Sequence, residues 1–202
     1  INIITKNPKF LKDQVNIKSS LKSFDTKENS ISINKNMNKF ILQTFASTTD
    51  SNGYRENNKF ENDTFKFDLS YLRDPLTRYS ASINYSDEYT GLPGSITLTD
   101  FYTRPRFVRS GSIDSFAEEK IQSWKLSNEK KVTRGKALTT IKYEEKDQKT
   151  SSMYSGVNIK AKTDLSTYTL SSKLNKKFTY NNLYMDTNLS LIHISEPTRR
   201  YF

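Results

Sequence analysis

Two strictly alternating segments joined by a tight turn constrain the fold of this chain more than any other feature. In residues 64–72 and 78–86 every second side chain is apolar, and the residues between them are mostly Ser, Asn, Asp or Lys. The apolar positions are Phe65, Phe67, Leu69, Tyr71, Tyr79, Ala81, Ile83 and Tyr85. Successive side chains of a strand point to opposite faces, so each segment has one apolar and one polar face. A half-buried soluble hairpin and a hairpin that crosses a membrane both fit this pattern.

The composition excludes one class of membrane protein and leaves another open. Only 34% of the 202 residues are hydrophobic, and no stretch approaches the 18 consecutive apolar residues of a membrane helix. The sequence therefore excludes a helical membrane protein. It leaves open a transmembrane β-barrel, in which half of every strand faces a polar lumen. The 12 Tyr and 12 Phe residues beside a single Trp are typical of a β protein.

The net charge of +10 raises the question of nucleic-acid binding, since Lys and Arg gain affinity by releasing counterions from phosphate. The Lys residues are scattered along nearly every segment rather than gathered in a block. We interpret them mainly as solvated side chains and expect no nucleic-acid partner. A soluble basic β protein that binds nucleic acid remains as a weaker alternative.

Nine segments have the composition and alternation of strands: 13–23, 29–34, 39–47, 63–73, 77–87, 119–131, 136–146, 164–175 and 179–188. Short connectors at 35–38, 74–76, 132–135 and 176–178 alternate with a second set at 24–28, 48–62, 87–118 and 147–163. Three members of the second set are long. An up-and-down barrel in an outer membrane has this parity, with tight periplasmic turns and long external loops. The pattern predicts an all-β, antiparallel, incomplete transmembrane barrel of about nine strands.

Four segments, in chain order, resemble motifs of the TonB-dependent outer-membrane receptors. Residues 1–6, Ile-Asn-Ile-Ile-Thr-Lys, are similar to the end of that family's plug domain. The Gly-Tyr-Arg-Glu-Asn run within residues 50–58 is similar to a Gly-Tyr-Arg-Asp-Asn loop. The Tyr-Thr-Gly-Leu-Pro-Gly-Ser-Ile-Thr run within residues 84–97 resembles the start of a long external loop, and residues 167–172 resemble a later strand.

The resemblance implies a fragment of an active-transport receptor in the bacterial outer membrane. Residues 1–8 would be the last plug strand and linker, and residues 9–188 the N-terminal part of the barrel. Such a receptor is not an enzyme and needs no cofactor. Its implied partners are outer-membrane lipid, a scarce nutrient such as a siderophore-bound iron or cobalamin, and the TonB complex through the plug region. The alternative from another class is a structural or enzymatic outer-membrane barrel.

The C-terminal residues 189–202 resemble a translated sequencing-adapter read-through, and we predict that they are a non-native tail. They contain His193, which is the single His of the chain, and Pro197, which is poorly tolerated inside a ladder. The chain also contains no Cys. Nucleophilic catalysis that uses His or Cys, and His-rich metal sites, are therefore not expected. We predict neither a catalytic nor a metal site.

The candidate binding chemistry lies in the predicted external loops, where aromatic area is interleaved with fixed positive charge. Such side chains can hold a bulky, partly anionic ligand by stacking and by charge-assisted hydrogen bonds. The candidate ligand-binding residues are Tyr54, Arg55, Tyr89, Phe101, Tyr102, Arg104, Arg106 and Arg109. The competing interpretation is that they pack the loops against their neighbours and contact lipopolysaccharide phosphates.

Overall fold

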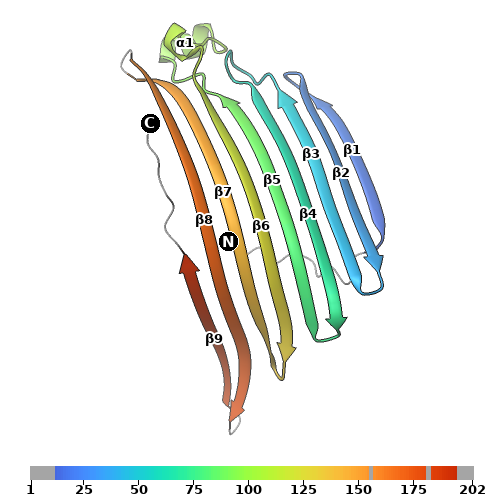
Figure 1. Ribbon diagram of the computed structural model, residues 1–202. Helices are drawn as coiled ribbons and strands as arrows, with labels where there is room; N and C mark the ends of the chain where they lie inside the picture. Colours follow the sequence, from blue (N-terminus) through green and yellow to red (C-terminus); the bar gives the residue numbers. More distant parts are fainter. Residues whose placement is uncertain (1–11, 155–156, 181–182, 195–202) are drawn as a thin grey trace.

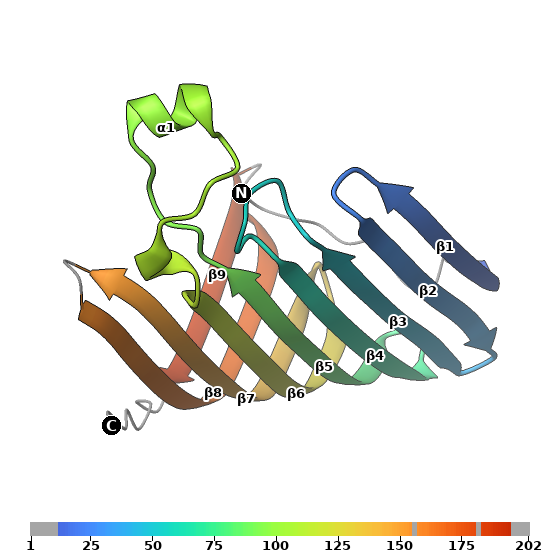
Figure 2. The same ribbon diagram turned by 90° about the horizontal axis from the view of Figure 1, so that it is seen from above.

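The computed structural model describes residues 12–154, 157–180 and 183–194. Within them, nine strands form one antiparallel sheet in which each strand pairs with the next along the chain (Figure 1). The strands are β1 (Gln14–Lys22), β2 (Thr26–Met37), β3 (Phe40–Ser51), β4 (Phe60–Asp74), β5 (Thr77–Gly91), β6 (Phe116–Val132), β7 (Gly135–Tyr154), β8 (Val157–Tyr180) and β9 (Leu183–Ile194). This confirms the predicted all-β, up-and-down topology. Seen from above, the sheet is curved and open (Figure 2).

The strand register gathers the apolar side chains on one face of the sheet. One row of directly paired residues runs Val15, Ile33, Thr44, Phe67, Ile83, Trp124, Tyr143 and Tyr168. The adjoining row runs Leu42, Leu69, Ala81, Leu126, Ile141 and Leu170. The rows are half-buried in β2 to β5 and exposed over much of β6 to β8, where Leu126 and Tyr168 each keep 60% of their surface accessible. We call this surface the apolar band.

The opposite face of the sheet is polar. A typical row on that face pairs Gln43, Asp68, Ser82, Lys125 and Lys142. Ser70, Ser82 and Ser123 are buried there, whereas Ile41 and Val108 are the buried hydrophobic residues of the described chain. A water-soluble domain buries its apolar face. This sheet exposes its apolar face instead, so its order comes from backbone ladders rather than from a hydrophobic core.

Three of the predicted tight turns are present at one end of the sheet, as the connectors 38–39, 75–76 and 133–134. Asn38 and Arg134 adopt positive φ values of 52° and 58° in two of them. The fourth, predicted at 176–178, is wrong, because these residues belong to β8 and pair with β9. At the other end, the connectors are 23–25, 52–59 and 92–115. The last of these contains α1 (Leu98–Thr103) and the short 3-10 helix η2 (Ser110–Ser112). In the described part of the chain no helix is both long and apolar enough to cross a membrane.

The predicted long loop at 147–163 is wrong. Strand β7 continues to Tyr154 and β8 begins at Val157, and Asp147 pairs directly with Asp164. Residues 147–152 are polar on both faces and give no sign of a strand, whereas Val157, Ile159 and Ala161 alternate with polar residues. Ladder hydrogen bonds join backbone groups and need no apolar face, so the hairpin extends well beyond the apolar band.

The predicted plug strand, residues 1–8, lies outside the described residues, as do residues 195–202 of the predicted tail. Residues 189–194 form the end of β9 and pair with β8, with Leu189 opposite Leu174.

Candidate functional site

Two loops at the same end of the sheet contain most of the predicted binding residues. Loop 52–59 joins β3 to β4, and loop 92–115 joins β5 to β6 and carries α1 beyond the strand ends (Figure 1). The strands β4 and β5 pair directly, so the two loops leave the sheet next to each other. Their side chains and backbones are extensively hydrogen-bonded to one another.

Arg55 connects the two loops through backbone carbonyl groups. Its Nη1 donates to Gly94 O at 2.6 Å, and its Nη2 donates to Pro93 O at 3.2 Å and to Phe107 O at 2.8 Å. Gly94 has a φ of +65°, a left-handed conformation that glycine adopts without a Cβ clash. The Arg55 guanidinium is therefore committed to the framework of loop 92–115 and is not directed at a ligand.

Asn57 makes a second connection to the same loop. Its Nδ2 donates to Ser112 O at 2.6 Å, Ser115 O at 2.8 Å and Leu92 O at 3.3 Å. Asn57 has a φ of 53°, a conformation that Asn tolerates better than most residues. Its backbone also packs closely on Gly91, where an added Cβ would lie 2.6 Å from Asn57 O. The site thus requires both the small Gly91 and the amide of Asn57.

A third group of contacts joins Tyr54 and Glu56 to Arg106 and Val108, with donors on both loops. Arg106 Nε donates to Tyr54 O at 2.9 Å, and Glu56 N donates to Arg106 O at 2.9 Å. Val108 N donates to Glu56 Oε2 at 3.2 Å, and the Val108 side chain is buried. Each loop therefore supplies donors and acceptors to the other.

Helix α1 is held by local capping interactions. The Thr97 hydroxyl donates to Asp100 Oδ2 at 2.7 Å and accepts from Asp100 N at 3.1 Å. Arg104 Nε donates to Asp100 Oδ1 at 2.7 Å, and the Arg104 guanidinium lies 3.7 Å above the Phe107 ring centre. The hydrogen bond from Thr97, followed by the one from Arg104, lowers the pKa of Asp100 below its ordinary value of 3.8.

The outer side of α1 is apolar and exposed. Leu98, Phe101 and Tyr102 occupy positions i, i+3 and i+4 and so share one face of the helix. Phe101 and Tyr102 are 57% and 75% exposed, and their rings meet edge to face with centres 5.4 Å apart. Chemically, this tip can contact the flat or apolar part of a ligand.

The eight predicted binding residues fall into separate groups. Tyr54, Arg55 and Arg106 meet at the loop junction, where the Arg106 guanidinium lies 5.6 Å from the Tyr54 ring. Phe101, Tyr102 and Arg104 belong to or flank α1, and Arg109 is exposed just before η2. Tyr89 lies apart, on β5, where it stacks on Phe116 at 5.8 Å.

Two residues of the junction were missed by sequence reasoning. Asn57 is the last residue of the Gly-Tyr-Arg-Glu-Asn run, and its place in that motif could have marked it as a candidate site residue. Phe24, in the turn between β1 and β2, has its ring 5.5 Å from Tyr54 and 5.9 Å from the Arg106 guanidinium. No sequence pattern predicts this contact, because it joins a strand turn to two distant loops.

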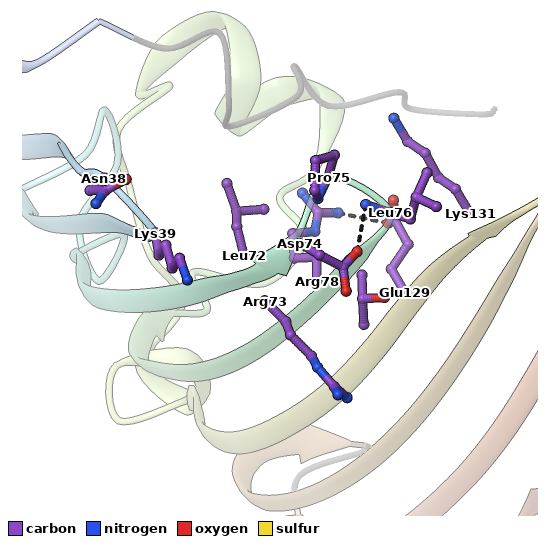
Figure 3. A pocket seen from close by; sticks show the side chains of 11 residues that line it. Asn38, Lys39, Leu72, Arg73, Asp74, Pro75, Leu76, Arg78, Glu129 and Lys131 are labelled. Carbon is purple, nitrogen blue, oxygen red and sulfur yellow. Dashed lines mark hydrogen bonds and ion pairs between the residues drawn. The ribbon is translucent and has the colours of Figure 1, made fainter.

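A hollow of about 500 Å³ lies at the opposite end of the sheet, among the short turns (Figure 3). Leu72 and Pro75 lie between Lys39 and Lys131 in this view. Beside the hollow, Arg78 and Lys136 each form a 2.7 Å ion pair with Glu129. Its lining is mixed: Lys39, Arg73, Arg78 and Lys131 lie among Asp74, Glu129 and uncharged residues. The sequence predicted no site there. No cluster of His, Cys, Asp and Glu that could hold a metal occurs in the part of the chain that the structure describes.

Solved structures resemble this sheet, although no family model matches the chain and no curated protein matches its sequence. The closed form of the ferric-catecholate import receptor Fiu from E. coli K12 superposes with a TM-score of 0.74 at 8% identity, covering 89% of this chain and 31% of the receptor. The unliganded ferric citrate transporter FecA gives 0.71 at 11% identity, covering 93% and 32%. The ferripyoverdine receptor of the Pseudomonas aeruginosa outer membrane gives 0.68 at 12% identity, covering 91% and 28%.

These comparisons establish the fold. The open meander has the architecture of part of a TonB-dependent receptor barrel, as the sequence motifs led us to expect. The chain spans about a third of the length of the receptors it matches.

Proposed function

We propose that this chain is part of a bacterial outer-membrane receptor that binds a scarce nutrient, such as a siderophore-bound iron, and imports it with energy from the TonB system. The apolar band is the observation that carries this proposal. Two register rows, apolar except at Thr44, cross β3 to β8 on one face of the sheet. Lipid is the environment in which such a surface is stable, since a monomeric soluble protein rarely exposes a large contiguous apolar patch.

The polar face and the strand order support a barrel wall rather than a soluble sheet. In a transmembrane barrel the lumen face is polar and the outer face apolar, which is the distribution seen here. The edges of β1 and β9 would pair with further strands of the complete receptor, because unpaired backbone groups are costly in lipid. Within this proposal, loops 52–59 and 92–115 face the cell exterior.

Ligand capture is assigned in this proposal to the exposed part of the two loops. Phe101 and Tyr102 offer aromatic area at the tip of α1, while Arg106 and Arg109 offer positive charge. This combination suits a bulky, partly anionic metal chelate. Arg55 is left out of the contact surface because its guanidinium is already bound to carbonyl groups.

The test is nutrient uptake by a strain that lacks its own copy of the receptor and carries the intact gene or a variant. Candidate radiolabelled ferric siderophores would be supplied one at a time. For the chelate that the receptor imports, the double variant F101A/Y102A is expected to weaken binding about tenfold or more, as for aromatic anchors at other interfaces. The chelate concentration that gives half-maximal uptake should rise accordingly. The matched control is T99A, on the same helix but outside the apolar side.

Two outcomes would contradict the proposal. Either the intact receptor supports uptake of no chelate in iron-starved cells, or uptake continues unchanged after deletion of residues 98–112. A receptor that remains in the soluble fraction after cell lysis would contradict the membrane location as well.

The ends of the chain are also part of the proposal. We assign residues 1–8 to the end of a plug domain and residues 189–202 to a non-native tail. A long sequencing read across the source locus tests both assignments. The expected result is a reading frame that continues upstream into a plug and that departs from the present sequence near Asn188 into further alternating strands. A frame that ends at Phe202 in the source would refute the tail assignment.

A further inference from the structure

We infer that Arg55 and Asn57 are positioning residues that couple loops 52–59 and 92–115 into one unit, so that the order of either loop depends on the other. This inference goes beyond the proposed function and does not depend on which ligand is bound. It rests on the direction and number of the contacts between the loops.

Both residues bridge the outgoing and returning stems of loop 92–115. Arg55 binds Pro93 and Gly94 on the outgoing stem and Phe107 on the returning stem. Asn57 binds Leu92 on the outgoing stem and Ser112 and Ser115 on the returning stem. A long loop loses much conformational entropy when its stems are held together. Side chains of loop 52–59 supply that restraint.

The stems themselves share a backbone hydrogen bond at the base of the loop, from Leu92 N to Ser115 O at 2.9 Å. Farther from the sheet, the Arg55 guanidinium spans the stems at the level of Gly94 and Phe107. A planar fork with several N–H donors can do this, whereas the ammonium of Lys is a compact point charge on a flexible stem. The geometry therefore depends on the shape of Arg55 as well as on its charge.

Loop 52–59 is in turn held by groups of loop 92–115. Glu56 is held through its amide by Arg106 O and through its carboxylate by Val108 N, and Tyr54 O accepts from Arg106 Nε. Coupling between two sites is reciprocal in free energy. A contact that orders α1 and its loop would accordingly order loop 52–59, and loosening either loop would loosen the other.

Hydrogen–deuterium exchange on the intact receptor in detergent micelles, without ligand, tests this coupling. The variants R55K and N57D retain side chains of similar length or size but lose the guanidinium fork and the amide donor. Each is expected to raise amide exchange about tenfold or more in both loops, while β4 and β5 keep wild-type protection. The reciprocal variant R106A, in loop 92–115, should raise exchange in loop 52–59.

Two controls separate coupling from general damage. R109A alters an exposed arginine of the same loop and should leave both loops unchanged. N57G keeps a residue that accepts the positive φ at this position but removes the amide, so it should reproduce the effect of N57D.

Increased exchange confined to loop 52–59 in R55K and N57D would overturn the inference, as would unchanged exchange in both loops. If R55K fails to assemble in the membrane, N57D tests the coupling from loop 52–59 and R106A tests it from loop 92–115. A failure of the proposed function would be seen in the uptake assay and not here, because the exchange measurement contains no ligand.

Discussion

Backbone conformation at single residues decides whether the loop junction can form. Gly53 has a φ of +69°, and a Cβ at this position would lie 2.1 Å from Asn58 O. Asn57, three residues before β4, also has a positive φ and offers its amide to loop 92–115. The short loop thus turns sharply at two residues whose side chains are compatible with that turn.

We predict that G53A destabilises loop 52–59 by about 1–3 kcal/mol, because Ala at positive φ is strained and the added Cβ overlaps a backbone carbonyl. Limited proteolysis of the intact receptor should show faster cleavage in the two loops. The matched control is S110A, at an exposed residue of loop 92–115. Equal cleavage of G53A and wild type would contradict the prediction.

The capping of α1 is predicted to depend on pH through Asp100. Its pKa is lowered in the folded loop by hydrogen bonds from Thr97 and Arg104, so folding favours the ionised carboxylate. The resulting stabilisation is present above the ordinary Asp pKa of 3.8 and is lost as the pH falls through the lowered pKa. Amide exchange in residues 98–104, corrected for its intrinsic pH dependence, should increase below this range. In D100N this pH dependence should be absent.

Among the secondary-structure elements, the strands of the hairpins follow the alternation of the sequence where one face is apolar. The pairing of Phe67 with Ile83 and of Leu69 with Ala81 joins apolar positions of β4 to apolar positions of β5, so the register follows from the pattern. Where both faces are polar, as in 147–152, the pattern gives no indication of a strand. The ladder nevertheless continues there.

A charge on the apolar band is predicted to be costly. Replacing Ile141 with Lys places an ammonium on the face that we assign to lipid, at a cost of about 2–4 kcal/mol at the bilayer centre. Its neighbour Thr140 points to the polar face, so T140K is the matched control. Refolding of the intact receptor into lipid vesicles, followed by urea titration, measures the difference. Equal destabilisation by the two variants would contradict the membrane assignment of this face.

At the scale of the whole molecule, the described sheet is open at β1 and β9, so each edge strand has one row of backbone groups without a ladder partner in the described residues. In lipid, such edges are not tolerated. We therefore predict that a polypeptide of residues 12–194 alone aggregates instead of inserting. Heat-modifiable migration on a denaturing gel, a property of closed barrels, should be seen for the intact receptor and not for this segment. A stable heat-modifiable form of the segment would contradict this expectation.

The sequence by itself determined the up-and-down strand order, the two faces of the sheet and the strands that alternate around an apolar face, but not the extension of β7 and β8 across 147–163. Alternation with a period of two is a local property, readable from residues such as Phe65, Phe67 and Leu69 without knowledge of the rest of the chain. The tertiary structure alone decided the roles of the loop residues. Arg55 looked like a ligand contact, but it binds the carbonyl groups of Pro93, Gly94 and Phe107, some 40 to 50 residues away. Every residue carries a backbone carbonyl, so such acceptors leave no signature in a sequence, and their positions are known only when the chain has folded.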